Sequence, residues 1–218
     1  MKRKFFVAIA FVWAVSIIWA ATIFSEEIKL VLLPAPHVDS GRPLMQVLKD
    51  RHSSRSFSSE KLSPQVLSDL LWAAFGINRP DSGKRTAPSA LNRQEIDIYV
   101  ATADGLYLYD AQSQALRLVL PDDIRALTGL QDFVKEAAVN LVYVADLSKI
   151  APASKEEKDL YSAADTGFIS QNVYLYCASE RLATVVRASI DRQALAKAMN
   201  LRPDQKIILA QSVGYPKK

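Results

Sequence analysis

The segment from Arg51 to Phe57 reads Arg-His-Ser-Ser-Arg-Ser-Phe and directly follows a short helix predicted over residues 44–50. Two guanidiniums, an imidazole and three hydroxyls within seven positions are typical of an anion site, because arginine can bind phosphate oxygens through two parallel hydrogen bonds. Backbone N–H groups in a turn add further donors. This pattern predicts a site for a phosphate monoester, and the alternative is a solvated basic turn.

Four further motifs follow this segment along the chain. They are Lys-Leu-Ser-Pro at 61–64, Leu-Leu-Trp-Ala-Ala-Phe-Gly-Ile-Asn-Arg at 70–79, Arg-Thr-Ala-Pro-Ser-Ala at 85–90 and Asp-Gly-Leu-Tyr-Leu-Tyr-Asp at 104–110. With the first segment, they resemble the FMN-dependent nitroreductase family, and the last three resemble its SagB-type dehydrogenase branch. The similarity runs from about residue 44 to residue 216.

The resemblance implies an α+β domain with a nitroreductase-like fold, in which helices flank a central, mostly antiparallel sheet. Hydrophobic periodicity agrees with this fold class. It predicts helices at 44–50, 64–75, 121–127, 156–179 and 192–199, a loop at 78–87, and strands at 96–102, 106–109, 115–119, 139–145, 184–186 and 207–213. Helices and strands alternate irregularly around a hairpin turn at Asp104-Gly105, which disfavours a doubly wound parallel sheet.

Residues 1–28 have the pattern of a signal peptide or membrane anchor. Three basic residues at positions 2–4 precede an apolar run from Phe5 to Phe24, which is long enough to span a bilayer. Positive charge keeps that end in the cytoplasm. We therefore expect an exported protein, periplasmic or anchored to the inner membrane facing outward. The alternative is a buried core helix, and cleavage of the segment stays open.

The remaining chain divides into a proline-containing linker or extended arm, 29–43, and one domain, 44–218. With one cysteine, Cys177, and two distant histidines, the sequence predicts neither a disulfide framework nor a metal site. The net charge of +4 is not gathered into a basic stripe with aromatics, which argues against nucleic acid binding. The seven glycines form no phosphate-binding motif, so a nucleotide-like cofactor would depend on side chains.

The resemblance implies FMN as the cofactor, and its contacts carry over onto three groups of residues. The phosphate and ribityl contacts are Arg51, His52 (through its backbone), Ser53, Arg55 and, near the C-terminus, Lys217. The turn that approaches the flavin ring contains Pro88, Ser89, Ala90 and Asn92. The residues expected at the pyrimidine edge and near the flavin N5 are Gln131, Ala188 and Ser189.

The function implied is a two-electron hydride transfer through flavin N5, to or from a small organic substrate. Hydride transfer needs alignment rather than a general acid or base, and no catalytic residue is evident. Tyr107, Tyr109 and Arg187 are the candidate protonating groups, with a structural role as the favoured alternative for all three. Residues 90–94 depart from the SagB-type pattern, which argues against azoline oxidation. Outside the cytoplasm we expect a donor other than NAD(P)H, such as a quinone or a redox partner.

The alternative function is a non-catalytic flavin-fold module for binding or scaffolding at the membrane. It is motivated by the few glycines and by the absence of the Arg-containing tail that many relatives carry.

The predicted helix 156–179 has no wholly polar face, which is typical of a helix buried on most sides. In the family, this helix lies against its two-fold mate, so the resemblance implies a homodimer with flavin sites formed by both subunits. The alternative is the central helix of a monomer.

Overall fold

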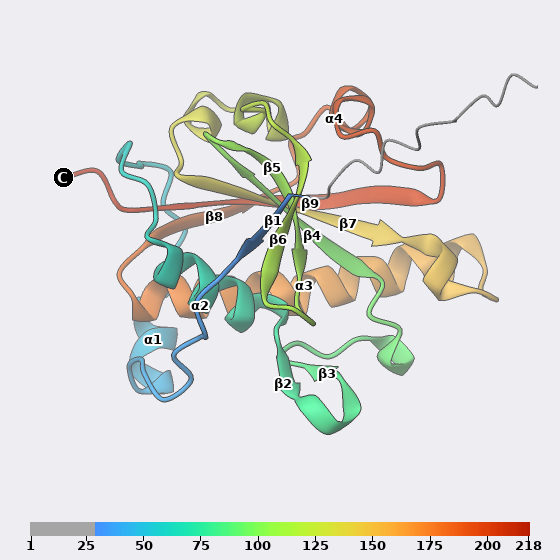
Figure 1. Cartoon of the computed structure of the whole chain (residues 1–218), viewed down its shortest axis with the longest axis horizontal. Helices are drawn as coiled ribbons and strands as arrows, with labels where there is room; N and C mark the ends of the chain where they lie inside the picture. Colours follow the sequence, from blue (N-terminus) through green and yellow to red (C-terminus); the bar gives the residue numbers. More distant parts are fainter. Residues whose placement is uncertain (1–28) are drawn as a thin grey trace, which may run out of the picture.

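The computed structural model describes residues 29–218, so the predicted signal or anchor segment lies outside the described part. The described chain is built around a seven-stranded sheet of order β1-β6-β5-β4-β7-β9-β8, in which every neighbouring pair is antiparallel (Figure 1). Its strands are β1 (Leu30–Leu32), β4 (Ile96–Thr102), β5 (Gly105–Asp110), β6 (Ala115–Leu120), β7 (Val139–Asp146), β8 (Ala183–Arg187) and β9 (Gln205–Gly214).

The α-helices are α1 (Leu44–Asp50), α2 (Pro64–Phe75), α3 (Lys155–Ser179) and α4 (Arg192–Ala198). Short 3-10 turns occur at Pro80–Ser82, Ala90–Asn92, Arg125–Thr128, Asp132–Lys135 and Leu147–Ile150. Among residues 29–218, no helix is long and apolar enough to cross a membrane. The α+β class, the antiparallel sheet and the flanking helices are confirmed.

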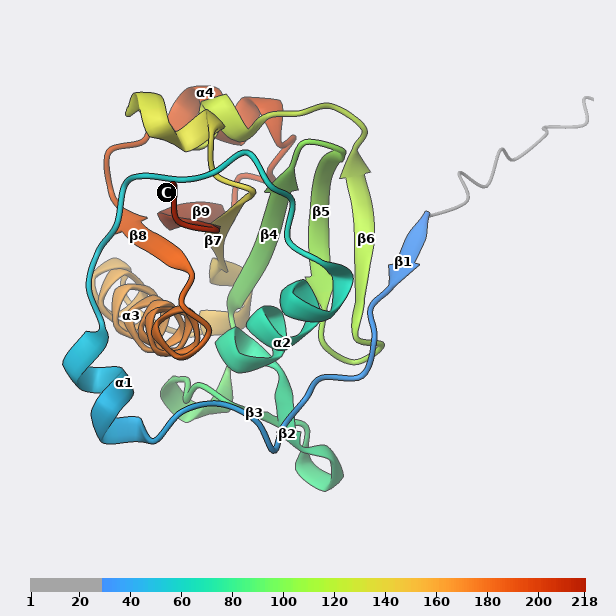
Figure 2. The same cartoon turned by 90° about the vertical axis from the view of Figure 1, so that its left-hand side faces the viewer.

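Both faces of the sheet are buried, which explains why β7 is apolar almost throughout. Successive side chains of a strand point to opposite faces. Leu141 and Tyr143 accordingly belong to the core beneath α2 and α3, whereas Val142 and Val144 belong to a second core that includes residues of α4. Figure 2 shows α2 and α3 on one side of the sheet and α4 on the other.

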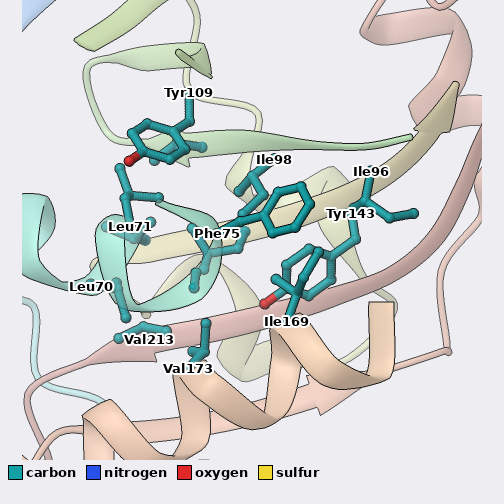
Figure 3. Packing of buried hydrophobic residues seen from close by; sticks show 14 of the residues in the cluster. Leu70, Leu71, Phe75, Ile96, Ile98, Tyr109, Tyr143, Ile169, Val173 and Val213 are labelled. Atoms are coloured by element: carbon teal, nitrogen blue, oxygen red, sulfur yellow. The ribbon is translucent and has the colours of Figure 1, made fainter. Parts of the chain in front are cut away.

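The larger core lies where α2 and α3 meet the middle of the sheet. Leu71 and Phe75 of α2 pack with Ile169 and Val173 of α3 and with Tyr143 of β7 (Figure 3). Burying one such large apolar side chain stabilises a fold by about 1.5 to 3 kcal/mol. This contact therefore fixes the position of α3, to which most of the candidate site is attached.

The bounds of α2 follow from local chemistry, as the sequence predicts. The Ser63 hydroxyl accepts a hydrogen bond from the Val66 N–H, and Pro64 occupies the first helical position, which needs no donor. At the other end, a Cβ on Gly76 would lie 2.4 Å from the Trp72 side chain, so the chain leaves the helix at a residue without one.

One predicted helix is absent, because residues 121–124 are not helical and only the 3-10 turn Arg125–Thr128 follows. The Asp123 carboxylate accepts from the Arg125 backbone N–H at 3.0 Å and from its guanidinium, and that guanidinium also donates to the carbonyl of Ala137. A short acidic side chain that bonds its own backbone competes with an α-helix.

The predicted loop 78–87 is also partly wrong, since it contains a small hairpin. Strands β2 (Ile77–Arg79) and β3 (Lys84–Arg85) pair antiparallel around a 3-10 turn that ends at Gly83, whose φ is +62°. The other predicted helices and strands agree with the structure to within two residues.

Residues 29–43 run along the domain instead of standing away from it. Strand β1 extends the sheet by pairing with β6. Farther along, the His37 N–H donates to Asp69 on α2 at 2.8 Å, and the Arg42 N–H donates to the Ser179 hydroxyl on α3 at 3.0 Å. The arm is thereby attached to the sheet and to both helices.

Candidate functional site

The segment 51–57 crosses the start of β8, where one aromatic side chain holds it. Phe57 is buried and packs with Phe133 and Val185. Backbone hydrogen bonds fix the rest, since the Ser54 N–H donates to the Thr184 carbonyl at 2.9 Å. The residues before Phe57 therefore lie at the surface in a defined conformation.

Tyr174 of α3 organises the basic part of this segment. Its hydroxyl shares a hydrogen bond with Ser53 Oγ at 2.8 Å and accepts one from the Val186 N–H of β8 at 3.0 Å. The Arg51 guanidinium lies 5.2 Å from the centre of the same ring, within the range of a cation–π contact. Sequence reasoning missed Tyr174, for which the available signal was a hydroxyl-bearing residue in a largely apolar helix.

The remaining predicted phosphate contacts lie beside this arrangement. His52 places Nδ1 2.7 Å from the Asp50 carbonyl, which directs its ring back toward α1. Arg55 is exposed, and the Lys217 N–H donates to the carbonyl of Ser56 at 3.4 Å, so the C-terminal lysine lies next to the segment. The backbone of Lys217 is thus attached to the end of the segment 51–56.

The residues expected at the ring edge meet at the end of β8. Ala188 and Ser189 are exposed immediately after this strand, and the Leu130 N–H donates to the Ser189 carbonyl at 3.1 Å. Gln131 follows directly. Its Oε1 is buried without a hydrogen-bond partner among the described residues and faces Gly129.

Arg187 is a structural residue rather than a protonating group. It is buried, and its guanidinium donates to the Thr128 carbonyl at 2.7 Å, to Asn140 Oδ1 at 2.9 Å and to Ser212 Oγ at 3.1 Å. Burial lowers the pKa of Arg187 to about 10, so the group stays charged at neutral pH.

The two tyrosine candidates are also structural. Tyr109 is buried, its hydroxyl donates to Gln114 Oε1 at 2.7 Å, and burial raises its pKa well above the ordinary value. The Tyr107 hydroxyl donates to the Asp104 carbonyl in the adjacent turn. Both residues lie on β5, which β4, β7 and β9 separate from β8. They therefore lie far from the residues gathered around 51–55.

The turn predicted to approach the flavin ring is attached to a different part of α3. The Ala90 N–H donates to Asp165 Oδ2 at 2.9 Å. Leu91, Asn92 and Gln94 have φ values of +53°, +54° and +50°, and left-handed conformations cost roughly 1 to 2 kcal/mol per residue without glycine. The Ser89 hydroxyl supports this shape by accepting from the Gln94 N–H at 3.0 Å.

The structure therefore collects the predicted residues into two groups on one helix. Residues 51–55, 130–131, 188–189 and 217 surround Tyr174 and β8, and residues 88–92 lie at Asp165. Nine positions separate the two attachment points, which is about 13 Å along the helix. The turn is not assembled with the basic segment of its own chain.

The donor set of the first group fits FMN. Exposed basic residues suit a phosphate dianion, and the Ser53 hydroxyl suits the phosphate or the ribityl chain. The chemistry of the site thus agrees with the phosphate and ribityl contacts that the resemblance implies.

The chain belongs to the nitroreductase family, whose family model matches residues 48–215. A crystal structure of a nitroreductase homologue from Ralstonia eutropha JMP134 is 42% identical, has a TM-score of 0.83 and is similar over 87% of this chain and 90% of that chain. A nitroreductase homologue of Methanocaldococcus jannaschii is 30% identical over 152 residues, which are 65% of this chain and 76% of the relative.

A more distant solved structure includes the cofactor. The nitroreductase homologue from Desulfovibrio desulfuricans, solved in complex with FMN, is 24% identical, has a TM-score of 0.58 and is similar over 82% of this chain and 89% of that chain. At this identity, the likeness shows a shared fold.

Proposed function

We propose that the protein is an FMN-dependent oxidoreductase that transfers a hydride through flavin N5, to or from a small organic substrate. The observation that carries the proposal is the basic segment 51–55, held by Tyr174 against β8. Family membership and the FMN-bound homologue support it. When bound, the flavin supplies the redox chemistry.

In this proposal, the chain's own residues bind and orient. Arg51 and Arg55 neutralise the phosphate, and Ser53, fixed by Tyr174, donates to it or to the ribityl chain. The Gln131 amide would contact the pyrimidine edge, and the backbone at 188–189 would lie beside the flavin ring. No described side chain needs to move a proton, because hydride transfer depends on distance and alignment.

We also propose a homodimer with two composite flavin sites. Polar residues of α3, such as Ser162 and Asp165, face its own chain, while Leu160 and Phe168 are 65% and 49% exposed. Leu160 and Phe168 thus form an outward apolar surface on α3. Covering them with a second copy buries an apolar patch.

Two α3 helices packed antiparallel would also complete the site. Asp165 and Tyr174 are equally far from the middle of this stretch, so a two-fold axis between Ile169 and Ser170 places position 165 of one copy opposite position 174 of the other. The partner's turn 88–92 then lies next to the basic segment of the first copy. This arrangement supplies the ring contact that a single chain leaves about 13 Å away.

The cofactor proposal is tested on purified full-length protein. We expect about one FMN per chain and an oxidised flavin spectrum that is bleached by a reductant. Replacing both Arg51 and Arg55 with alanine removes two charge-assisted contacts, each worth about 1.5 to 3 kcal/mol, so FMN affinity falls at least a hundredfold. Lys197→Ala, an exposed charge on the opposite face of the sheet, is the matched control. Equal affinity in all three proteins would refute the placement.

The proposed location is outside the cytoplasm, with residues 2–4 inside. It rests on the apolar run 5–24 and its basic flank. Alkaline phosphatase fused after Lys218 should be active, and a reporter that works only in the cytoplasm should be silent. The reverse result would contradict both this location and a donor other than NAD(P)H.

Kinship with the SagB-type branch rests on motifs 70–79, 85–90 and 104–110, and we do not extend it to azoline oxidation. The comparisons do not favour a non-catalytic module.

A further inference from the structure

A pair of buried carboxyl groups lies beneath the turn 88–92. Glu95 is 1% exposed, and neither of its carboxyl oxygens has a hydrogen-bond donor among the described residues. The group that faces it is the carboxyl of Asp165, which is 3% exposed. Two adjacent buried carboxylates cannot both ionise at low cost, so a proton between them supplies the donor that Glu95 lacks.

The surroundings agree with a shared proton. Burial, and after it the charge of Asp165, raises the pKa of Glu95 to about 7. Lys149, from the turn after β7, is the cation that acts on Glu95 in the opposite direction. The guanidinium of Arg93 is instead directed to the ring of Tyr161, 5.7 Å away.

Asp165 connects this pair to the turn. Its Oδ2 accepts from the Ala90 N–H at 2.9 Å, whereas the other hydrogen bonds of residues 89–92 in the described structure stay within 89–94. The turn carries left-handed residues directly after this attachment to α3, at Leu91 and Asn92, and such conformations persist only where their surroundings enforce them. A single acceptor on α3 therefore holds a strained turn.

We propose that Asp165, through a proton shared with Glu95, is a positioning residue that fixes the turn 88–92 for contact with the flavin. The inference rests on the proposed function, because it assigns the turn to the cofactor. Protonated Glu95 donates to Asp165, whose Oδ2 accepts from the Ala90 N–H. When the shared proton leaves, the two carboxylates repel each other and the turn loosens.

The test uses four variants of the full-length protein, with FMN affinity measured between pH 5.5 and 8.5. Asp165→Ala removes the acceptor and should weaken FMN binding at least tenfold. Asp165→Asn keeps an oxygen for Ala90 and adds an N–H for Glu95, so it should stay within threefold of wild type. Glu95→Gln donates at every pH, so it should lose the fall in affinity that wild type shows as pH rises through 7. Ser162→Ala, one turn away on α3, should match wild type.

A second readout does not need the flavin. In the flavin-free protein, exchange of the Ala90 amide hydrogen with solvent should be slow at pH 6, faster in Asp165→Ala and close to wild type in Ser162→Ala. Because the FMN phosphate itself titrates near pH 6, the decisive comparison of affinities is between wild type and Glu95→Gln, in which that ionisation is the same.

The outcomes separate this inference from the proposed function. If Arg51→Ala/Arg55→Ala weakens FMN binding but Asp165→Ala leaves both affinity and Ala90 exchange unchanged, the inference is wrong and the proposed function stands. If the arginine variant also has no effect, the proposed function fails. If Asp165→Ala does not fold, Glu95→Gln decides. An FMN affinity that depends on pH in this variant as it does in wild type would overturn the inference.

Discussion

The two attachment points on α3 differ in how well their polar groups are paired. At Tyr174, the hydroxyl bonds Ser53 and the Val186 N–H, both at ordinary distances. At Asp165, the neighbouring Glu95 has no donor, and the hydroxyls of Ser162 and Thr166 are buried without partners among the described residues. The Tyr174 hydroxyl is thus fully paired within one chain. The Asp165 region contains polar groups that one chain does not satisfy, which is where a shared proton, a bound water or a second subunit can act.

The largest effect on this contrast should come from separating the proposed dimer. Phe168→Glu adds a charge twice at a two-fold contact, so we expect dissociation to monomers together with loss of flavin. Light scattering after size exclusion, with absorbance at the flavin band, measures both in full-length protein. Lys197→Glu on α4 is the control and should remain dimeric. A Phe168→Glu monomer that retains FMN would show that each chain holds a complete site.

The next effect is on stability and concerns only the Asp165 end. In the unfolded chain, Glu95 ionises near its ordinary pKa of 4.5, whereas in the folded protein its pKa is about 7. The folded state therefore holds more protons between these values, and the free energy of unfolding should fall by about 3 kcal/mol as pH rises from 4.5 to 7, then level off. Urea titrations across this range give the slope. Glu95→Gln should reduce it, and an equal slope in both proteins would contradict the assignment.

The smallest effect is expected at the Tyr174 end. Tyr174→Phe keeps the ring beneath Arg51 but leaves Ser53 and the Val186 N–H each one hydrogen bond short, so the free energy of unfolding should fall by about 1 to 3 kcal/mol. FMN affinity should fall up to tenfold, without a change in its pH dependence. The matched control is Tyr176→Phe. Among the described residues, the Tyr176 hydroxyl donates to the Val66 carbonyl alone, at 3.3 Å. If the pH dependence of FMN affinity changed in Tyr174→Phe, the Tyr174 and Asp165 attachment points would be coupled.

The same contrast explains what could be predicted from the sequence. The strands and helices follow hydrophobic periodicity, and the segment 51–57 is a local motif, so both were accessible. The helix predicted at 121–127 is missing because the Asp123 carboxylate accepts from the Arg125 backbone N–H. Hydrophobic periodicity does not detect this competition. The Glu95 and Asp165 carboxyls are 70 positions apart in sequence and meet only because α3 packs beneath β4. No local sequence pattern predicts that pairing.

Because β1 is attached to the sheet, the domain could not move far from a membrane that held the N-terminal segment. The Lys29 carbonyl already accepts a hydrogen bond from the Leu118 N–H, so only residues 25–28 separate the apolar run from the edge of the sheet. Four residues reach about 14 Å when fully extended. So short a tether would keep the domain at the bilayer surface, within reach of molecules that diffuse along that surface.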